Sequence, residues 1–240
     1  MRFDDRLVVI TGIGRKGQVG EAVARAFGER GARLVLVARS EQHARDRAAD
    51  LPATGAQVMA FGADLADAAA AENLAARVLA ATGSRLHALV NLAGGFAASG
   101  PVADADPREW HRMLEINLLT AMNATRVFLP ALREARGAIV YIASEAALPS
   151  SRPAGIGAYA AAKGAVVSLM RAVAAEERTR GIRANALAPG AIRTADNIAS
   201  MGEHAAFVER DAFAEAVLWL CTDASRAVTG QIIRLGAQPP

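Results

Sequence analysis

Residues 7–27 read LVVITGIGRKGQVGEAVARAF, and they set the class of fold to expect. A short run rich in β-branched residues leads into a glycine-rich turn, which opens an alanine-rich segment with helical periodicity. Glycine lets the backbone approach a phosphate closely, and a helix N-terminus offers unpaired N–H groups and the positive end of a dipole. This order of elements therefore predicts a dinucleotide-binding site, in which Gly12, Gly17 and Gly20 approach the phosphates.

The alternation of strand and helix continues along the whole chain. The predicted strands are 7–11, 33–38, 56–61, 88–92, 138–143, 183–188 and 231–235, and the predicted helices are 18–30, 41–50, 67–82, 107–134, 157–180 and 211–222. Strands that are apolar on both faces and separated by helices are typical of a parallel sheet covered on both sides. We therefore predict an α/β fold: a single doubly wound (Rossmann) domain over residues 1–240, with a parallel seven-stranded sheet, helices on both faces, and cofactor and catalytic sites together. Segments 144–157 and 190–210 are predicted to be loops, since they contain Pro, Gly, Ser or scattered polar residues.

The composition argues against several classes of partner. The formal net charge is +3, and the arginines are spread without a run of like charge or an aromatic-rich basic stretch, which disfavours nucleic acid. No apolar run approaches the roughly 20 residues of a membrane span, and the charged N-terminus MRFDDR does not resemble a signal peptide. The single cysteine, Cys221, permits no internal disulfide. We therefore expect a cytoplasmic protein that binds neither nucleic acid nor membranes.

The end of the second predicted strand bears on the choice of dinucleotide. A carboxylate there would hydrogen-bond the ribose hydroxyls of NAD and repel the 2′-phosphate of NADP. Here the strand is followed by Arg39 and Ser40, a guanidinium fork and a hydroxyl that suit a phosphate ester. Arg15 and Lys16 in the glycine-rich turn would add two more cations. We predict NADP (NADPH) rather than NAD; the alternatives are that these cations are solvated surface charges and that Glu41 serves a ribose.

A second short stretch, YAAAK at 159–163, bears on the chemistry. The chain has only two tyrosines and two lysines, against 25 arginines, yet Tyr159 and Lys163 stand four residues apart, on one face of a helix. A compact ammonium beside a phenol favours the phenolate and lowers the phenol pKa, so this tyrosine could donate a proton to a carbonyl oxygen and accept it back. The alternative is a surface helix on which the tyrosine packs and the lysine is solvated.

These features belong to an ordered series of motifs. The series runs TGxxx…G after the first strand, Asp64-Leu65 after the third, NLAG (91–94) after the fourth, Asn117 within EINLL, Ser144 at the end of the fifth, YAAAK (159–163), and APG (188–190) after the sixth. In this order, and over essentially its whole length, the sequence resembles the short-chain dehydrogenases/reductases. The resemblance implies an NADP(H)-dependent oxidoreductase that transfers a hydride between nicotinamide and a carbonyl or alcohol substrate.

The resemblance also implies roles for individual residues. Tyr159 would be the general acid and base, Lys163 would lower the pKa of Tyr159 and hold the nicotinamide ribose, and Ser144 would donate a hydrogen bond to the substrate oxygen. Asn117 would hold a water that links Lys163 to solvent. The other implied cofactor contacts are Asp64 and Leu65 at the adenine, Asn91, Ala93 and Gly94 along the wall, and Pro189, Gly190, Ile192 and Thr194 at the nicotinamide end.

The glycine-rich turn departs from the commonest pattern of this family. The span from Gly12 to Gly20 is longer than in TGxxxGxG, and Gln18 stands where the middle glycine is expected. A longer loop of this kind resembles enoyl reductases, which raises C=C reduction as an alternative. Those relatives separate tyrosine and lysine by six residues, however, and position 166 here is Val166. A third alternative is an NADP-binding sensor or partner subunit without turnover, against which the intact serine, tyrosine and lysine argue.

The substrate pocket is expected from position alone. Few residues separate Thr194 from the helix predicted at 211–222, which suggests a short lid and an open pocket. Such a pocket would suit a bulky or carrier-borne carbonyl substrate, as in a 3-oxoacyl ketoreductase, or a cyclic ketone. Phe96, Glu145 and Arg152 are expected to line it.

Assembly and metal content are expected on similar grounds. Members of this family assemble through two long helices, here about 118–134 and 157–180, and both are alanine-rich on more than one face, which permits close packing. We therefore expect a homodimer or homotetramer. His43, His111 and His204 show no ligand spacing with Cys, Asp or Glu, so we expect no metal site.

Overall fold

The strands form one parallel sheet. The computed structural model describes residues 2–51 and 57–237, and in this part of the chain seven strands pair in the order β3-β2-β1-β4-β5-β6-β7, each neighbouring pair parallel. They are β1 (Leu7–Thr11), β2 (Arg33–Ala38), β3 (Val58–Gly62), β4 (Ala88–Asn91), β5 (Ala138–Ile142), β6 (Arg183–Pro189) and β7 (Ile232–Leu235). The predicted doubly wound sheet is confirmed, because the strand order reverses between β1 and β4.

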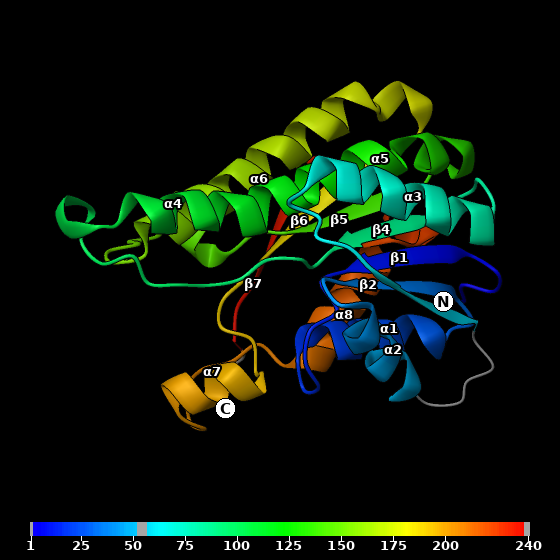
Figure 1. The fold of residues 1–240 in the computed structure, drawn as a ribbon. Coiled ribbons are helices and arrows are strands. Elements are labelled where there is room, and N and C mark those ends of the chain that lie inside the picture. The colour runs from blue at the N-terminus through cyan, green and yellow to red at the C-terminus, as the bar shows by residue number, and fades with distance from the viewer. Residues whose placement is uncertain (1, 52–56, 238–240) are drawn as a thin grey trace.

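Helices cover both faces of this sheet. They are α1 (Val19–Gly28), α2 (Glu41–Ala49), α3 (Ala68–Thr82), α4 (Pro107–Leu114), α5 (Thr120–Ala135), α6 (Gly157–Glu176), α7 (Ala195–Met201) and α8 (Arg210–Leu220). Figure 1 shows α3, α5 and α6 on one face, and α1, α2 and α8 on the other. α7 lies apart from both layers, below the carboxyl end of β6 (Figure 1).

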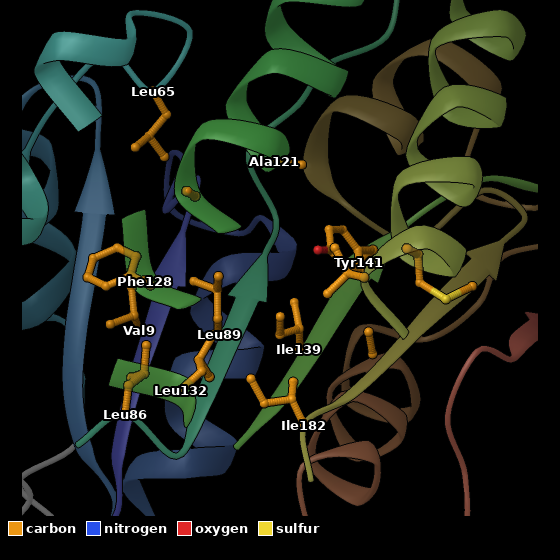
Figure 2. Packing of buried hydrophobic residues seen from close by; sticks show 14 of the residues in the cluster. Val9, Leu65, Leu86, Leu89, Ala121, Phe128, Leu132, Ile139, Tyr141 and Ile182 are labelled. Atoms are coloured by element: carbon orange, nitrogen blue, oxygen red, sulfur yellow. The ribbon is translucent and has the colours of Figure 1, made fainter. Parts of the chain in front are cut away.

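Alternation along the strands divides the core into two clusters. In β1, Leu7 and Val9 pack under α3, α5 and α6, whereas Val8 and Ile10 pack under α1 and α8. All four side chains are at most 1% exposed. Figure 2 shows the first cluster, where Phe128 of α5 lies over the strands. The uniformly apolar run LVVI therefore encodes a strand that is buried on both faces.

The helix predicted at 107–134 is interrupted. α4 ends at Leu114, a π-helical turn occupies Glu115–Leu119, and α5 follows without a break in the helical path. This turn is the EINLL motif, and it contains Asn117, whose side chain is 1% exposed. Single π-helical turns inside longer helices are frequent at functional sites, so this departure from the predicted helix coincides with a predicted site residue.

The prediction of a loop over 190–210 is wrong in part, because this segment contains α7. The hydroxyl of Thr194 accepts a hydrogen bond from the backbone N–H of Asn197 at 3.2 Å, which caps the helix, and Asp196 stands in its first turn. Two of the polar residues that suggested a loop are thus the N-cap of α7, Thr194, and a carboxylate that interacts favourably with the helix dipole, Asp196. The segment 144–157 has one short 3₁₀ turn at Glu145–Ala147. In the third predicted strand, Ala56 lies outside the described residues.

α6 is the most apolar of the long helices. By length and mean hydropathy it is the one helix in the described residues that could cross a membrane, and half of the relevant window is buried inside the fold. It packs on α4, β5 and β6, and it carries both Tyr159 and Lys163. The apolar composition of α6 is therefore accounted for by its place in the core of the α/β fold.

Candidate active site

The loops that follow β1 and β4 meet at the carboxyl edge of the sheet. Gly12 has φ +71°, and a Cβ atom there would lie 2.3 Å from the backbone nitrogen of Ala93, so only glycine permits this approach. The hydroxyl of Thr11 accepts a hydrogen bond from the same N–H at 3.4 Å. The strand order reverses between these two strands, and the crevice at such a point is where open α/β sheets bind ligands.

A cavity of about 460 Å³ lies at this crevice. Six residues predicted from the sequence line it, namely Gly12, Arg39, Asp64, Leu65, Ala93 and Gly94. Other lining residues were not predicted: Ile13 after β1, and Arg112, Glu115, Ile116 and Thr120 around the π-helical turn. The glycine backbone at Gly12 and Gly94 gives one side of the cavity a surface without side chains, and the guanidinium of Arg39 borders the cavity. These features fit a phosphate-bearing dinucleotide.

The residues after β2 divide between the cavity and the surface. Arg39 is exposed, lines the cavity and makes no ion pair within the described residues. Ser40 is the N-cap of α2 and accepts from the N–H of His43 at 3.5 Å. Glu41 is held by Arg45 and by Arg77, and the bond with Arg77 lowers the pKa of its carboxyl. Its carboxylate is therefore already engaged by cations.

The loop after β3 is fixed from α5. The side-chain amide of Asn123, which is 3% exposed, donates to the carbonyl oxygens of Leu65 at 2.9 Å and Ala66 at 3.2 Å. Asp64 accepts a hydrogen bond from the N–H of Ala66 at 3.0 Å, which turns the chain there. Asn123 was not predicted, because its role becomes visible only when α5 is placed beside this loop.

The rest of the glycine-rich turn points elsewhere. Arg15 pairs with Asp196 of α7 at 2.7 Å, and Lys16 lies 3.9 Å from Asp50. The N–H of Gly17 donates to the carboxylate of Glu21 at 2.7 Å. Gly20 is buried, and a Cβ there would lie 3.0 Å from Ile13. The cavity lining does not include the four residues predicted here, Arg15, Lys16, Gly17 and Gly20.

Tyr159 and Lys163 meet Ser144 beside Gly94. The Lys163 ammonium lies 5.9 Å from the centre of the Tyr159 ring and donates to the carbonyl oxygen of Ile142, at the end of β5, at 2.8 Å. A Cβ at Gly94 would lie 3.4 Å from the same ammonium. The oxygen of Ser144 accepts from the N–H of Ala146 at 3.2 Å. The structure thus brings these side chains together with the wall of the cavity.

Burial governs the protonation of this group. It raises the pKa of the Tyr159 phenol above its usual value, and an interaction with the Ser144 hydroxyl opposes this in part. It lowers the pKa of Lys163 to about 8. The sequence predicted a phenol with a lowered pKa; in the protein alone desolvation outweighs its neighbours, so that prediction is wrong in direction. The phenol is consequently protonated at neutral pH.

Asn117 ties the π-helical turn to the loop after β4. Its side-chain oxygen accepts from the N–H of Gly95 at 3.2 Å, and its amide group donates to the carbonyl oxygens of Gly95 and Met113, both at 3.0 Å. A Cβ at Gly94 would lie 2.6 Å from that oxygen. The side-chain amide is therefore used in holding the Gly94–Gly95 backbone against Lys163.

Asn91 belongs to a buried polar chain. Its amide donates to the hydroxyl of Thr125 at 3.3 Å, and that hydroxyl lies 2.8 Å from the phenol oxygen of Tyr141. Within the described residues, the Asn91 side-chain oxygen is the one buried side-chain polar atom that has no hydrogen-bond partner. Burial raises the pKa of Tyr141, which keeps its phenol protonated. Thr125 and Tyr141 gave no signal in the sequence, because each looks like an ordinary core residue.

The segment after β6 lies beside Glu145, and none of the cofactor contacts predicted there, Pro189, Gly190, Ile192 and Thr194, lines the cavity. Gly190, directly after Pro189, donates its N–H to the carbonyl oxygen of Leu235 at 3.0 Å. A Cβ at Gly190 would lie 3.1 Å from the carboxylate of Glu145. Ile192 is 9% exposed and Thr194 is 5% exposed, which places both at the start of α7 with little contact with solvent.

The residues expected around the substrate lie at two places. The ring of Phe96 is 64% exposed and meets Tyr159 edge-on, with 5.1 Å between ring centres. Glu145 pairs with Arg234 of β7 at 2.6 Å, a partner that the sequence analysis missed. Glu145, Arg234 and Arg152 line a shallow cavity of about 200 Å³ next to the short turn after Ser144. Among the described residues, no group of His, Cys, Asp or Glu could hold a metal ion.

A crevice at the carboxyl edge of the sheet, flanked by a partly buried tyrosine and a buried lysine, defines the general class, a cofactor-binding α/β protein. Comparison with known proteins defines the family. Residues 6–204 match the family model described as short chain dehydrogenase. Meso-2,3-butanediol dehydrogenase of Serratia marcescens is 36% identical over 194 residues, which cover 81% of this chain and 74% of that protein. Galactitol 2-dehydrogenase (L-tagatose-forming) of Cereibacter sphaeroides is 35% identical, covering 97% and 94%. The crystal structure of levodione reductase superposes with a TM-score of 0.89 at 29% identity, covering 98% of this chain and 97% of that one.

The chain therefore belongs to the short-chain dehydrogenase/reductase family, as its motifs predicted. This is a family of oxidoreductases that use a nicotinamide cofactor.

Proposed function

We propose that the protein is an NADP(H)-dependent oxidoreductase that transfers a hydride between the nicotinamide and a carbonyl or alcohol substrate, with Tyr159 as the general acid and base. The observation that carries this proposal is the meeting of Tyr159 and Lys163 beside Gly94, which itself lines the cavity after β1. The relatives named above for butanediol, galactitol and levodione support alcohols and ketones as the substrate class.

Residues along the cavity hold the dinucleotide. The backbone at Gly12 and Gly94 gives the phosphates and ribose close access, and Asp64 lies where the adenine is expected. Arg39 favours NADP, because an exposed guanidinium without an ion-pair partner in the described residues is available to a 2′-phosphate, whereas Glu41 is already held by two arginines. When bound, the nicotinamide supplies or accepts the hydride.

Tyr159 supplies the proton in the direction of reduction. Its raised pKa keeps the phenol protonated at neutral pH, so it can donate to the carbonyl oxygen of the substrate. Ser144 accepts a hydrogen bond from Ala146, which leaves its O–H group to donate to the same oxygen as negative charge develops. Lys163 is fixed at the end of β5 by the carbonyl of Ile142, and Asn117 holds the Gly94–Gly95 backbone in place.

The substrate reaches this group from the side of Phe96 and Glu145. An exposed aromatic ring next to the phenol gives an apolar contact, and the ion pair of Glu145 with Arg234 gives a polar one. An open site of this kind suits a bulky carbonyl compound, including a 3-oxoacyl group presented on a carrier. Reduction of a C=C bond is the competing chemistry, and the four-residue separation of Tyr159 and Lys163 favours the carbonyl.

The substitution Tyr159→Phe tests the proposed chemistry. We expect it to lower kcat for ketone reduction by about 10²–10⁴-fold, the range for loss of a general acid, while the Kd of NADPH stays within a few-fold, because the ring still packs against Phe96. The rate is followed by NADPH absorbance over a panel of ketones, 3-oxoacyl thioesters, alcohols and conjugated enones.

The only other tyrosine in the chain provides the matched control. Tyr141→Phe removes the same hydroxyl from a fully buried position in β5, and we expect this variant to keep most of the rate. If Tyr159→Phe reduces ketones as fast as the unaltered protein, the proposed role of Tyr159 is excluded. If enones are the only compounds consumed, the reaction is C=C reduction instead.

The substitution Arg39→Asp tests the choice of cofactor. A carboxylate at this position repels a 2′-phosphate and accepts hydrogen bonds from ribose hydroxyls, so we expect the ratio of kcat/KM for NADPH to that for NADH to fall by at least tenfold. Arg45→Asp, which changes a nearby exposed arginine on α2 that pairs with Glu41, is the control. An unchanged ratio in Arg39→Asp would show that another group reads the ribose.

A further inference from the structure

A second large cavity lies at the opposite edge of the sheet. It has a volume of about 690 Å³, and its lining includes six arginines: Arg6, Arg85, Arg136, Arg178, Arg183 and Arg226. Arg6 directly precedes β1 and Arg183 begins β6, so the cavity lies at the amino ends of the strands. Five-residue strands span about 16 Å, and their length separates this cavity from the candidate active site.

The charge of this cavity is strongly unbalanced. Its lining contains a single acidic residue, Asp223, and that carboxylate is 3.1 Å from the guanidinium of Arg6. The other five lining arginines make no ion pair within the described residues. The whole chain has a net charge of only +3, so six cations around one cavity are a local concentration of charge.

The neighbouring surface extends the positive field. A shallower cavity beside the first shares Arg136 and Arg178 with it and adds Arg133 and Arg180. The acidic residue packed between these two cations is Glu177, which is 2% exposed and already engaged by both. Its carboxylate is therefore not available to neutralise the first cavity.

Arg183 is one of the two partly buried arginines among the six. It is half-buried, and its guanidinium donates to the backbone carbonyls of Thr222 at 3.2 Å and Val228 at 3.3 Å, with no ion pair in the described residues. Asp223 acts on Arg183 only at a distance, so this partly desolvated cation lacks the directly paired counter-charge that usually compensates burial. An anion in the cavity would supply that charge.

The shape of the site is set by a glycine. Gly181 has φ +79°, and a Cβ there would lie 3.3 Å from the aliphatic stem of Arg136, so that stem lies across the glycine. Arg136 itself has a left-handed backbone at the end of α5. The backbone geometry thus places Arg136 at the rim of the cavity.

We propose that this cavity, which we name the arginine basin, binds a small molecule that carries two or more linked phosphate groups. Guanidinium groups bind phosphate oxygens in a bidentate manner, and several of them around one concave surface match a chain of phosphates better than a single anion. No Phe, Tyr or Trp side chain is among the described residues that line the basin, so the phosphate chain and not a stacked base is the recognised part.

Titration calorimetry of the full chain with sodium tripolyphosphate tests the proposal. Two exposed arginines of the basin are changed together in the variant Arg178→Gln/Arg226→Gln, which removes two charges without touching the core. Loss of two charge-assisted contacts is expected to raise the Kd of tripolyphosphate at least about tenfold. The affinity of the unaltered protein should also fall as ionic strength rises.

Two controls locate the binding. Arg108→Gln/Arg171→Gln removes the same number of charges from exposed helix positions outside the basin, and Arg39→Gln removes the cation of the cofactor cavity. Both are expected to leave the Kd of tripolyphosphate within about twofold, because neither position lines the basin. If the Kd of tripolyphosphate rises equally in the basin variant and in the charge-matched control, the effect comes from net charge alone and the proposal is overturned.

His87 supplies a local reporter. It is one of only four histidines, and it lines the basin. Its Nδ1 accepts the N–H of Leu7 at 3.1 Å, as expected of a structural histidine. In spectra of protein with ¹⁵N-labelled histidine, tripolyphosphate is expected to shift the His87 resonance and to leave those of His43, His111 and His204 in place. Binding without a shift at His87 would mean that the ligand sits elsewhere.

Two further binding measurements, with ATP and with phospholipid vesicles, identify the source of the phosphates. Equal affinity for ATP and tripolyphosphate would identify the phosphate chain alone as the ligand feature, and tighter binding of ATP would identify a nucleoside polyphosphate. Vesicles of anionic phospholipid test the other source of phosphate groups. If the basin variant loses vesicle binding while tripolyphosphate does not bind the unaltered protein, the basin is a membrane contact and the proposal of a small-molecule site is wrong.

Discussion

Lys163 is a cation in a place with little water. Its side chain is 6% exposed, its ammonium is fixed by the carbonyl of Ile142, and burial lowers its pKa to about 8. An ammonium can lose its proton in such a place, whereas a guanidinium cannot. This explains in physical terms why one of only two lysines in an arginine-rich chain stands beside Tyr159.

The lowered pKa of Lys163 predicts a pH dependence of stability. Below about pH 8 the folded and unfolded chains both hold the proton; between about 8 and 10.5 only the unfolded chain holds it, and above 10.5 neither does. Because the unfolded state then binds more protons, the free energy of unfolding contributed by this group rises with pH across that window. At 1.36 kcal/mol per pKa unit, the gain is up to about 3 kcal/mol.

Urea unfolding at intervals from pH 7 to 10.5 measures this gain. The unaltered protein is compared with Lys163→Met, which keeps the length and packing of the side chain but has no proton to lose. The other groups that titrate in this range are shared by the two proteins and cancel in the difference. We expect the difference in the free energy of unfolding to shift in favour of the unaltered protein as pH rises. Parallel profiles would show that the ammonium is not desolvated.

Single side chains were the part of the site least accessible to sequence reasoning. Tyr159 and Lys163 lie one helical turn apart, and Ser144 joins them from the end of β5. The helical spacing and the end of the strand can both be read in the sequence. Arg15 and Lys16 looked like phosphate ligands, yet each lies against an acidic residue brought near by folding. The partner of a long charged side chain depends on tertiary packing, which no local pattern records.

Among the elements, α5 does more than cover the sheet. Its residue Thr125 stands between Asn91 at the end of β4 and Tyr141 of β5, and these three side chains form a polar chain inside an otherwise apolar layer. The π-helical turn that precedes α5 holds Asn117 against the loop after β4. One helical unit therefore fixes both the backbone wall of the cavity and a side chain behind it.

The substitution Thr125→Val tests how far α5 holds the two strands. It keeps the shape of the side chain and removes the hydrogen-bond partner of two buried polar groups, the Asn91 amide and the Tyr141 phenol. Leaving them unpaired is expected to cost about 2–6 kcal/mol of unfolding free energy, because each orphaned group costs about 1–3 kcal/mol. Chemical denaturation of the single variants and of Thr125→Val/Tyr141→Phe measures the effect.

The double variant distinguishes a hydrogen-bonded chain from packing alone. With the Tyr141 phenol also removed, one fewer buried polar group is left without a partner. The double substitution should therefore lower the free energy of unfolding by less than the sum of the two single ones, by at least about 0.5 kcal/mol. Strict additivity would mean that the hydroxyls of Thr125 and Tyr141 do not depend on each other for stability.

α7 and the π-helical turn show what element prediction from sequence lacks. Residues 195–201 mix apolar and polar side chains, and none of them is buried, so only the cap at Thr194 marks the helix. The π-helical turn follows the same periodicity as the helices around it, and the extra residue becomes visible only in the backbone. The long elements, by contrast, were predicted to within a few residues, since burial on one or both faces leaves a clear pattern.

At the scale of the whole molecule, the order of elements was the safest inference. Alternating apolar strands and helices imply parallel pairing with right-handed crossovers, and these rules leave few topologies to choose from. The reversal of strand order between β1 and β4 then places the glycine-rich turn and the NLAG segment side by side. The arginine basin could not be anticipated, because its cations come from segments that meet only at the amino ends of the strands.

The outer face of α6 bears on assembly. Four of its six exposed positions carry small side chains, namely Ala161, Ser168, Ala172 and Ala175, and a Cβ at Gly164 would meet nothing within 4 Å. A face of small residues lets a second helix approach closely. With the family's usual use of this helix, it leads us to expect a homodimer or homotetramer in solution.

Light scattering after size exclusion tests this expectation, and Ser168→Arg tests the face. Ser168 is exposed and bonds only to the carbonyl of Gly164 one turn earlier, so a long charged side chain fits on the monomer while it blocks the approach of a second α6. We expect this variant to have a smaller mass than the unaltered protein at the same concentration. Ser84→Arg, at an exposed position after α3, adds the same side chain and should leave the mass unchanged. A monomeric unaltered protein, or equal masses in all three, would exclude α6 as the contact between copies.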